Sequence, residues 1–192
     1  PDAARESFLI AKKHGIKCIL DQFIGHPLVL NKILTAEEVF RPELKNVIKD
    51  KLSPEKTKRL LQEIELADII IAGSKFVEGT LLENNVPRNK IKIIPYGVDN
   101  KLFYPAEQKN QNLKKFQILF VGNISIRKGC HYLLEAIKEI NSGNIELTMV
   151  GQMEDNYFLN RFGNFFKWIP EVSHSEIPNF YREADVCVHP SL

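Results

Sequence analysis

Two adjacent cations, Arg127 and Lys128, lie between the glycines Gly122 and Gly129 in the stretch FQILFVGNISIRKG, residues 116–129. A glycine turn lets a ligand approach the backbone, and basic side chains attract an anion. The first amides of a helix point outward with a partial positive charge, so a helix start suits a phosphate group. This pattern therefore predicts a phosphate site, although two solvated cations opening an ordinary helix fit the spacing equally well.

The elements on either side of these residues position them. Residues 118–121 are a short apolar run with the length of a buried parallel strand. Apolar residues then recur at helical spacing at Leu133, Leu134, Ile137 and Ile140. A strand, a glycine turn and a helix make half of a βαβ unit.

A second candidate, His26, follows a strand predicted at residues 16–21, in the loop QFIGHP. In open α/β sheets, ligands bind at the loops that follow the strands. A histidine between a glycine and a proline is also a common turn residue. His26 is therefore either a turn residue or a polar group facing an active-site cleft.

Composition narrows the function classes. A length of 192 residues fits one large or two small domains, and 44% hydrophobic residues suits a globular core. A net charge of +2 lacks the basic excess of a nucleic-acid binder, so no nucleic-acid partner is expected. No run approaches the ~20 apolar residues that span a bilayer, and no signal peptide is visible, which predicts a cytoplasmic protein. Three cysteines without zinc spacing are expected as buried thiols: Cys18, Cys130 and Cys187.

Strand and helix patterns alternate on both sides of a polar stretch. Strands are predicted at residues 16–21, 68–73 and 91–94 before it, and at 117–121, 145–150, 165–169 and 184–189 after it. Helices are predicted at residues 3–14, 75–84, 128–141 and 175–183, with residues 32–67 helical but broken by two prolines. Ser53 and Ser74 are predicted helix N-caps. This order predicts an α/β fold with parallel sheets and right-handed crossovers.

The polar run EQKNQNLKK predicts a linker at residues 99–115, between a first domain at 1–98 and a second at 116–192. The chain starts with a proline and stops in mid-pattern, so we expect a fragment. No Walker A, G-x-G-x-x-G, G-x-S-x-G, H-E-x-x-H or Asp-x-Asp motif occurs. Phosphate chemistry would then use protein cations and backbone dipoles, with neither a metal nor a cofactor. Glu63 and Glu65 face different sides of a helix and are expected on the solvated surface.

Taken together, the segments resemble the retaining glycosyltransferases of the GT-B fold, family 4. The matching stretches are ADIIIAGSKFVEGTLLENNV, KIKIIPYGVDNKLFYP, ILFVGNISIRKGCHYLLEAI, LTMVG and IPNFYREADVCVHPSL, in the family's order over roughly residues 63–192. The resemblance implies two Rossmann-like domains facing a cleft, with a nucleotide-sugar donor bound mainly by the second. This chain would hold the end of the first domain and the start of the second.

By position in the family's motif, Lys128 contacts the donor diphosphate. Asn123 stands where the family has an arginine, and Arg127 is predicted to supply that charge. Catalytic roles are thus expected for Lys128, Arg127 and His26, with His26 contacting the donor sugar or positioning the acceptor. The donor-binding positions implied are Gly122, Asn123, Lys128, Gly151, Pro190 and Ser191. The family's paired glutamates would follow Leu192, so the chain alone is expected to be inactive.

The implied reaction moves a sugar, a hexose by analogy, from a nucleotide sugar to an acceptor with retention at the anomeric carbon. Preorganised cations would stabilise the charge that grows on the leaving diphosphate. No carboxylate pair suited to double displacement is found, and none is required here. The acceptor is a glycan, a lipid-linked sugar or a small molecule, and a lipid-linked one would bring the enzyme to the inner membrane surface. A GT-B epimerase or phosphorylase, or a non-catalytic nucleotide-sugar or glycan-binding module, stays open.

Overall fold

The computed structural model describes residues 4–105 and 115–192. These residues form two compact units, which are taken in turn below. The first unit holds the chain up to Glu37 and again Lys51–Gly97, and the second holds Glu38–Asp50 and the chain from Val98 onward. No helix among the residues described is long and apolar enough to cross a membrane.

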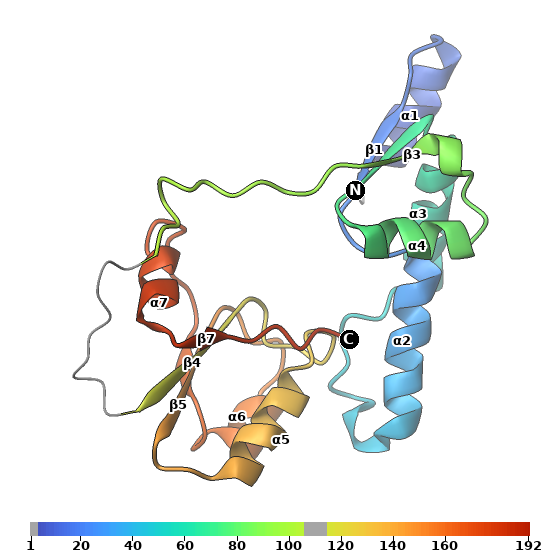
Figure 1. Ribbon diagram of the computed structural model, residues 1–192. Coiled ribbons are helices and arrows are strands. Elements are labelled where there is room, and N and C mark those ends of the chain that lie inside the picture. The colour runs from blue at the N-terminus through green and yellow to red at the C-terminus, as the bar shows by residue number, and fades with distance from the viewer. Residues whose placement is uncertain (1–3, 106–114) are drawn as a thin grey trace. The chain divides into compact units, whose positions relative to one another are not determined.

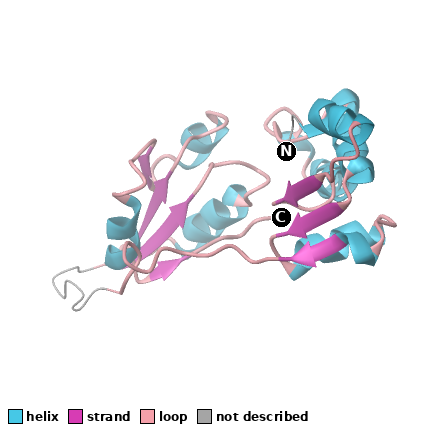
Figure 2. Ribbon diagram, turned by 90° about the horizontal axis from the view of Figure 1, so that it is seen from above, coloured by secondary structure: helices cyan, strands magenta, loops and turns pink. Residues whose placement is uncertain are grey.

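The first unit contains a parallel sheet in the order β1-β2-β3 (Figures 1 and 2). Its strands are β1 (Ile19–Gln22), β2 (Ile69–Ala72) and β3 (Ile91–Ile93). Its helices are α1 (Ala4–Lys13), α2 (Pro27–Phe40), α3 (Pro54–Leu66) and α4 (Lys75–Glu83), with a 3₁₀ turn η2 (Arg88–Lys90); α2 continues past the unit's boundary at Glu37.

The first core forms because strand residues alternate between faces while helix residues recur on one side. Its buried members are Leu20, Ile64, Ala67, Ile70, Ala72, Val77, Leu81, Val86 and Ile91. Ser53 and Ser74 cap α3 and α4 as predicted, their hydroxyls accepting the amides of Lys56 (3.1 Å) and Val77 (3.2 Å). On the other face of β1, Ile19 is 54% exposed.

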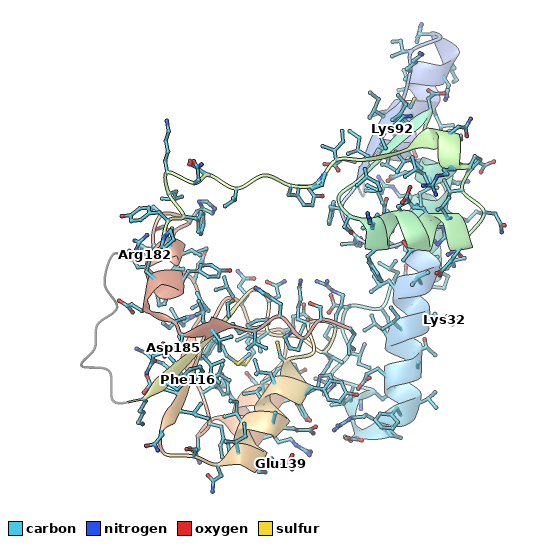
Figure 3. All side chains as sticks on the ribbon, viewed as in Figure 1. Lys32, Lys92, Phe116, Glu139, Arg182 and Asp185 are labelled. Atoms are coloured by element: carbon cyan, nitrogen blue, oxygen red, sulfur yellow. The ribbon has the colours of Figure 1, made fainter. Side chains whose placement is uncertain are left out.

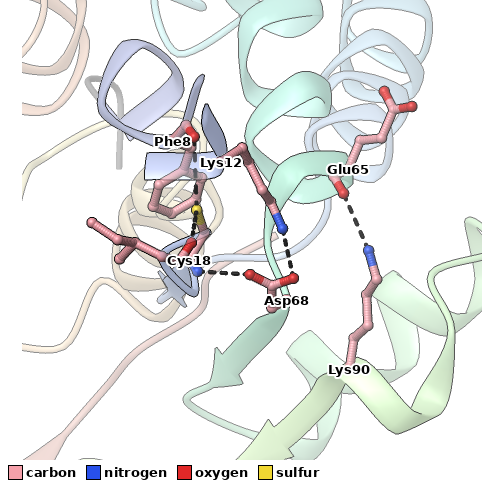
Figure 4. Close-up of polar contacts among 7 residues, drawn as sticks. Phe8, Lys12, Cys18, Glu65, Asp68 and Lys90 are labelled. Carbon is pink, nitrogen blue, oxygen red and sulfur yellow. Dashed lines mark hydrogen bonds and ion pairs between the residues drawn. The ribbon is translucent and has the colours of Figure 1, made fainter. Parts of the chain in front are cut away.

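Asp68 ties the amino ends of β1 and β2 to α1 (Figure 4). Its Oδ1 accepts from Lys12 Nζ at 2.6 Å, and its Oδ2 accepts from the Cys18 amide at 2.7 Å. The Asp68 amide donates in turn to the Cys18 carbonyl at 2.8 Å. The Lys12 contact, and then the Cys18 amide, lower the pKa of Asp68. The carboxylate therefore fixes where the two strands begin to pair.

Glu63 was expected on the solvated surface, but this expectation is wrong because the residue is only 1% exposed. Its Oε1 accepts the Arg5 amide at 3.1 Å, so it caps the start of α1. Arg59 Nε lies 3.6 Å from the same oxygen. The spacing of Glu63 and Glu65 indicated that they face different sides, but not that one side would be covered by another helix.

The second unit is a four-stranded parallel sheet in the order β6-β5-β4-β7. Its strands are β4 (Phe116–Val121), β5 (Ile145–Val150), β6 (Lys167–Ile169) and β7 (Val186–Cys187). Its helices are α5 (Cys130–Ile140), α6 (Tyr157–Phe162) and α7 (Ile177–Glu183), with a 3₁₀ turn η1 (Pro42–Leu44). Figure 1 shows α5 and α6 on one side of this sheet and α7 on the other. The α/β class with parallel sheets is confirmed.

The pairing of β4 with β7 starts as the pairing of β1 with β2 does. Asp185 Oδ2 accepts the Gln117 amide at 2.8 Å, and the Asp185 amide donates to the Gln117 carbonyl at 2.8 Å. Figure 3 shows Asp185 and Phe116 close together at this end of the sheet. In each unit, an Ala-Asp pair directly before a strand locks that strand to its neighbour.

Several predicted bounds shift for physical reasons. The helix predicted from Lys128 begins at Cys130, because Gly129 has φ 66° and cannot be helical. Helix α6 lies between two predicted strands, where no helix was predicted; its Phe158 and Phe162 are buried, four residues apart on one face. Most of the predicted linker, residues 106–114, lies outside the described residues.

The largest difference from the predicted domains concerns residues 38–50, which we call the strap. The sequence assigns them to the first domain, but they pack in the second unit. Leu44 is fully buried there, and Val47 and Ile48 are 9% and 8% exposed. These contacts join residues distant in sequence, so the local pattern does not reveal them.

The cysteines are all free thiols. Cys18 and Cys130 are buried as predicted, at 2% and 0% exposure. Burial raises the pKa of the Cys130 thiol to about 12, so it stays protonated and packs as a small apolar group. Cys187 is only half-buried, because β7 covers two residues rather than the predicted six.

Candidate functional site

The predicted site lies where the strands of the second sheet end. Gly122 follows β4 and Gly151 follows β5, both with positive φ (141° and 138°). A Cβ on Gly151 would lie 2.2 Å from the Gly122 carbonyl oxygen, so the two turns are in contact. The Gly122 amide donates to Val150 O at 2.9 Å. Only glycine permits this approach, and it leaves two bare backbone turns side by side.

The chain after β7 joins the same edge. A Cβ on Gly129 would lie 1.9 Å from the Pro190 carbonyl oxygen, so the two backbones touch. The Leu192 amide donates to Arg127 O at 3.0 Å. The structure thus gathers the predicted positions Gly122, Asn123, Lys128, Gly151, Pro190 and Ser191 along one edge of one sheet. Their role in donor binding stays a prediction.

The start of α5 differs from the predicted phosphate site, because its amides are not free. The Lys128 amide donates to the Ser125 hydroxyl at 3.3 Å. The Gly129 and Cys130 amides donate to the carbonyls of Ile126 (2.8 Å) and Ser125 (3.3 Å). The expectation of unpaired amides is therefore wrong for these three residues. Any anion here would depend on the Lys128 ammonium and the positive end of the α5 dipole.

Arg127 makes a contact that the sequence did not predict. Its Nε donates to Asp50 Oδ1 at 2.9 Å, and the two side chains are only 26% and 17% exposed. Glu154, on the loop after β5, lies beside this pair: burial first and then Asp50 raise its pKa to about 6, while Arg127 lowers it. The guanidinium of Arg127 is therefore fixed in an ion pair rather than free in solvent.

His26 lies in the first unit at the start of α2. Its Nδ1 accepts the Leu28 amide at 3.4 Å, and its carbonyl accepts the Val29 amide at 2.9 Å, so it serves as the helix N-cap. Its own amide donates to Thr80 Oγ1 at 2.9 Å. The residue is 3% exposed, and burial lowers the pKa of its imidazole. The neutral ring then carries its proton on Nε2, so His26 can donate one hydrogen bond; its predicted catalytic role stays untested.

Other features of the second unit do not coincide with this edge. A cavity of about 280 Å³ lies against α7, and Gln117, Glu146 and Glu183 are among its lining residues. It runs toward the strand starts, away from the glycine turns. Within the part of the chain that the structure describes, no group of three metal-ligating side chains comes together.

The sequence alone missed Ser125, Asp50 and Glu154. Ser125 is 1% exposed and holds the Lys128 amide, a role that a serine three residues earlier could have suggested. Asp50 lies 77 residues before Arg127 in the sequence, and no motif links the two. Only the packing of the strap brings this carboxylate to the strand edge.

Comparison with solved structures defines the class of fold. HepE of Anabaena, solved in complex with UDP and glucose, matches 100% of this chain with a TM-score of 0.70 and 17% identity; the chain covers 51% of HepE. Sucrose-phosphate synthase of Thermosynechococcus elongatus matches 97% of the chain with a TM-score of 0.62 and 21% identity, 53% of that protein being covered. The two α/β units have the fold of GT-B glycosyltransferases.

Sequence comparison matches the second part of the chain to a family of glycosyltransferases. Residues 105–192, which include the strand edge, match the family described as glycosyl transferases group 1. The D-inositol 3-phosphate glycosyltransferase of Paenarthrobacter aurescens is 29% identical over 122 residues, covering 54% of this chain and 30% of the relative. An uncharacterised glycosyltransferase of Methanocaldococcus jannaschii is 28% identical over 128 residues, 65% of this chain and 34% of that one. The chain thus spans about a third of the length of these relatives.

Proposed function

We propose that this chain is part of a retaining glycosyltransferase of family 4, which transfers a hexose from a nucleotide sugar to an acceptor. The observation that carries the proposal is the strand edge of the second unit, where the Gly122 and Gly151 turns meet and Lys128 directly precedes the Gly129–Pro190 contact. This edge lies within the segment that matches glycosyl transferases group 1. Bare backbone beside a cation suits a diphosphate.

The chemistry assigns one step to Lys128. When the bond between sugar and phosphate breaks, negative charge grows on the departing nucleoside diphosphate. A fixed ammonium aimed at that charge lowers the barrier without reorganising at the moment of reaction. Ser125 holds the Lys128 amide, so the backbone that presents the ammonium is fixed. His26, neutral and carrying a proton on Nε2, would donate a hydrogen bond to the donor sugar or the acceptor.

The proposal extends to the cofactor requirement and the acceptor. The sequence has no Asp-x-Asp pair, and protein cations would do the work of a divalent metal, so transfer should continue in EDTA. The acceptor is a glycan, a lipid-linked sugar or a small molecule. We place the enzyme in the cytoplasm, where a lipid-linked acceptor would bring it to the inner membrane surface.

The test is Lys128→Ala, assayed with a panel of nucleotide sugars that begins with UDP-glucose, the ligand named for HepE. The whole protein that contains this chain is used, with free, glycan and vesicle-borne lipid-linked acceptors. The variant should lower kcat by about 10²–10³-fold, the usual effect of one lost electrostatic donor. Lys32→Ala, an exposed lysine on α2 (Figure 3), is the charge-matched control and should keep full activity.

Product analysis separates the reaction classes. A transferred sugar of retained configuration together with released diphosphate supports the proposal. Release of an epimer, or tight binding of a nucleotide sugar with no turnover, would contradict it. Unchanged turnover in a folded Lys128→Ala variant would show that this lysine is only a solvated residue before the start of α5.

A further inference from the structure

The strap, residues 38–50, is clamped to the second unit at both of its ends. At one end, Arg41 donates through Nη1 and Nη2 to both oxygens of Glu135 on α5, at 2.6 and 2.7 Å. The Arg41 guanidinium also lies 4.9 Å from the centre of the Tyr132 ring. A bidentate pair that is also stacked fixes both distance and direction. This end of the strap is therefore held by geometry as well as by charge.

The middle of the strap is held by apolar contacts. Leu44 is fully buried, so its apolar side chain is removed from water and favours the packed state. Val47 and Ile48 add to this core. The strap therefore has apolar contacts in addition to the ionic contact of its last residue, Asp50.

Asp50 lies at the other end, against the predicted donor site. Its Oδ1 accepts from Arg127 Nε, and the neighbouring Lys49 Nζ lies 3.6 Å from Asp155 on the loop after β5. Asp50 Oδ2 is buried and accepts no hydrogen bond from any donor among the described residues. The carboxyl of Glu154 stands beside it. A proton shared between the two carboxyls would satisfy that oxygen.

The contact occupies only one of the nitrogens of Arg127. Nε points to Asp50, and neither Nη atom has a bond to that carboxylate. Arg127 adjoins Lys128 in the chain, and the exposed amide of Asn123 provides no charge at this edge. A carboxylate behind an arginine restricts the directions that its remaining N–H groups can take.

We propose that Asp50 is a positioning residue for the nucleotide-sugar site, holding Arg127 so that its Nη groups form the second cationic contact beside Lys128. The inference rests on the proposed function. It explains how a strap from an early part of the chain serves a site built from residues 122–192. It also assigns to the Arg127 guanidinium, held by Asp50, the positive charge that Asn123 does not provide.

The test measures UDP-glucose binding by titration calorimetry, together with KM and kcat, in the whole protein. Asp50→Asn should weaken binding about tenfold, the loss of one charge-assisted contact. Asp50→Glu, which keeps the carboxylate, should recover part of that loss. Arg127→Ala should weaken binding at least as much, and the double variant should be no weaker than Arg127→Ala alone. Lys49→Ala, which removes the adjacent ion pair, is the control and should bind as the wild type does.

The pH dependence of UDP-glucose affinity provides a measurement that would not change if Asp50 had a purely structural role. UDP-glucose keeps its charge between pH 5 and 8, so any change comes from the protein. Affinity should fall several-fold as the pH rises through about 6, because Glu154 ionises and competes for Arg127. The charged and titratable groups around Glu154 are Asp50, Arg127 and Cys130, with the pair Lys49–Asp155 adjoining them. Glu154→Gln should flatten the profile.

The outcomes separate this inference from the proposed function. Additive losses in the double variant, or an Asp50→Asn variant that binds as the wild type does, overturn the positioning role. If Lys128→Ala weakens binding while Asp50→Asn does not, the donor site stands and only this inference fails. If Lys128→Ala also binds normally, the proposed function fails with it.

Discussion

The two units begin their strand pairs identically and differ at the opposite end of the sheet. Asp68 and Asp185 each follow an alanine, precede a strand and exchange two hydrogen bonds with the neighbouring strand. At the carboxyl ends, the first unit presents a buried neutral histidine, His26, that caps a helix. The second unit presents glycine turns in contact, with Lys128 and a held arginine beside them.

The comparison shows that the same two hydrogen bonds start the strand pairing in two sheets whose carboxyl ends differ in chemistry. In both units the Ala-Asp pair acts through the two hydrogen bonds at the start of a strand, and these bonds do not involve the far end of the sheet. The far end can vary because loops tolerate more variation in sequence than the strands and helices that they connect. Charges at the amino ends thus stabilise the fold, whereas charges at the carboxyl end of the second sheet form the candidate site.

The largest loss of folding stability is expected from one of two matched glycine substitutions. Gly15 and Gly129 have nearly equal φ (67° and 66°), but a Cβ on Gly15 meets nothing within 4 Å while one on Gly129 collides with Pro190 O. Gly15→Ala should cost about 1–2 kcal/mol, the strain of a left-handed residue. Gly129→Ala should cost about 3 kcal/mol or more, because strain and collision add.

Denaturant unfolding of each variant measures these losses. The single tryptophan, Trp168 on β6, donates through Nε1 to Gly151 O at 2.9 Å, so its fluorescence reports the second unit. Hydrogen exchange of β1 and β2 reports the first. Equal losses from the two substitutions would show that the Gly129–Pro190 contact relaxes easily and does not define the edge.

A loss of stability of medium size is expected from breaking the Arg41–Glu135 pair that holds the strap, since no bidentate Arg–Glu pair occurs among the described residues of the first unit. A double-mutant cycle with Arg41→Met and Glu135→Gln should give a coupling energy of about 1–3 kcal/mol toward unfolding of the second unit. Arg161 provides the matched control, since its Nη2 lies 3.9 Å from the same Glu135 and its side chain is 46% exposed. Its coupling should stay below about 1 kcal/mol. Similar values for both arginines would mean that the bidentate geometry adds nothing.

The smallest effect is expected in the pH dependence of folding stability, which should differ between the two units. Glu154 has a pKa raised from 4.5 to about 6, so the folded second unit binds this proton more tightly than the unfolded chain. That stabilisation is complete below pH 4.5 and disappears as the pH rises through 6. His26 has a lowered pKa, so the first unit loses stability as the pH falls below 6.5. The two units should therefore have pH slopes of opposite sign.

Urea unfolding at pH 5 and pH 7 measures these slopes, with Trp168 fluorescence for the second unit and hydrogen exchange for the first. Glu154→Gln should remove the slope of the second unit. His26→Asn, which keeps a capping side chain, should remove that of the first. Slopes of the same sign in the wild type, or slopes that survive these substitutions, would contradict the assignment.

Local patterns in the sequence predicted most of the elements. The apolar run of β4 and the helical spacing of Leu133, Leu134 and Ile137 stand at their predicted places. Helix α6 was not predicted because its segment is short, and only the burial of Phe158 and Phe162 shows that one side of it packs against the core. The start of α5 was misplaced because a left-handed glycine at 129 is invisible to periodicity.

The sequence by itself determined the parallel α/β order, the caps at Ser53 and Ser74, and the glycines and lysine of the candidate site. These depend on chain stereochemistry and on repeats of two to four residues, which operate locally. Only the tertiary structure decided that Glu63 is buried, that the amides of Lys128 and Gly129 are already bonded, and that Arg127 pairs with Asp50. That pairing depends on where the strap returns to the sheet, and such a return is set by the packing of Leu44 and Arg41 rather than by any neighbour in sequence.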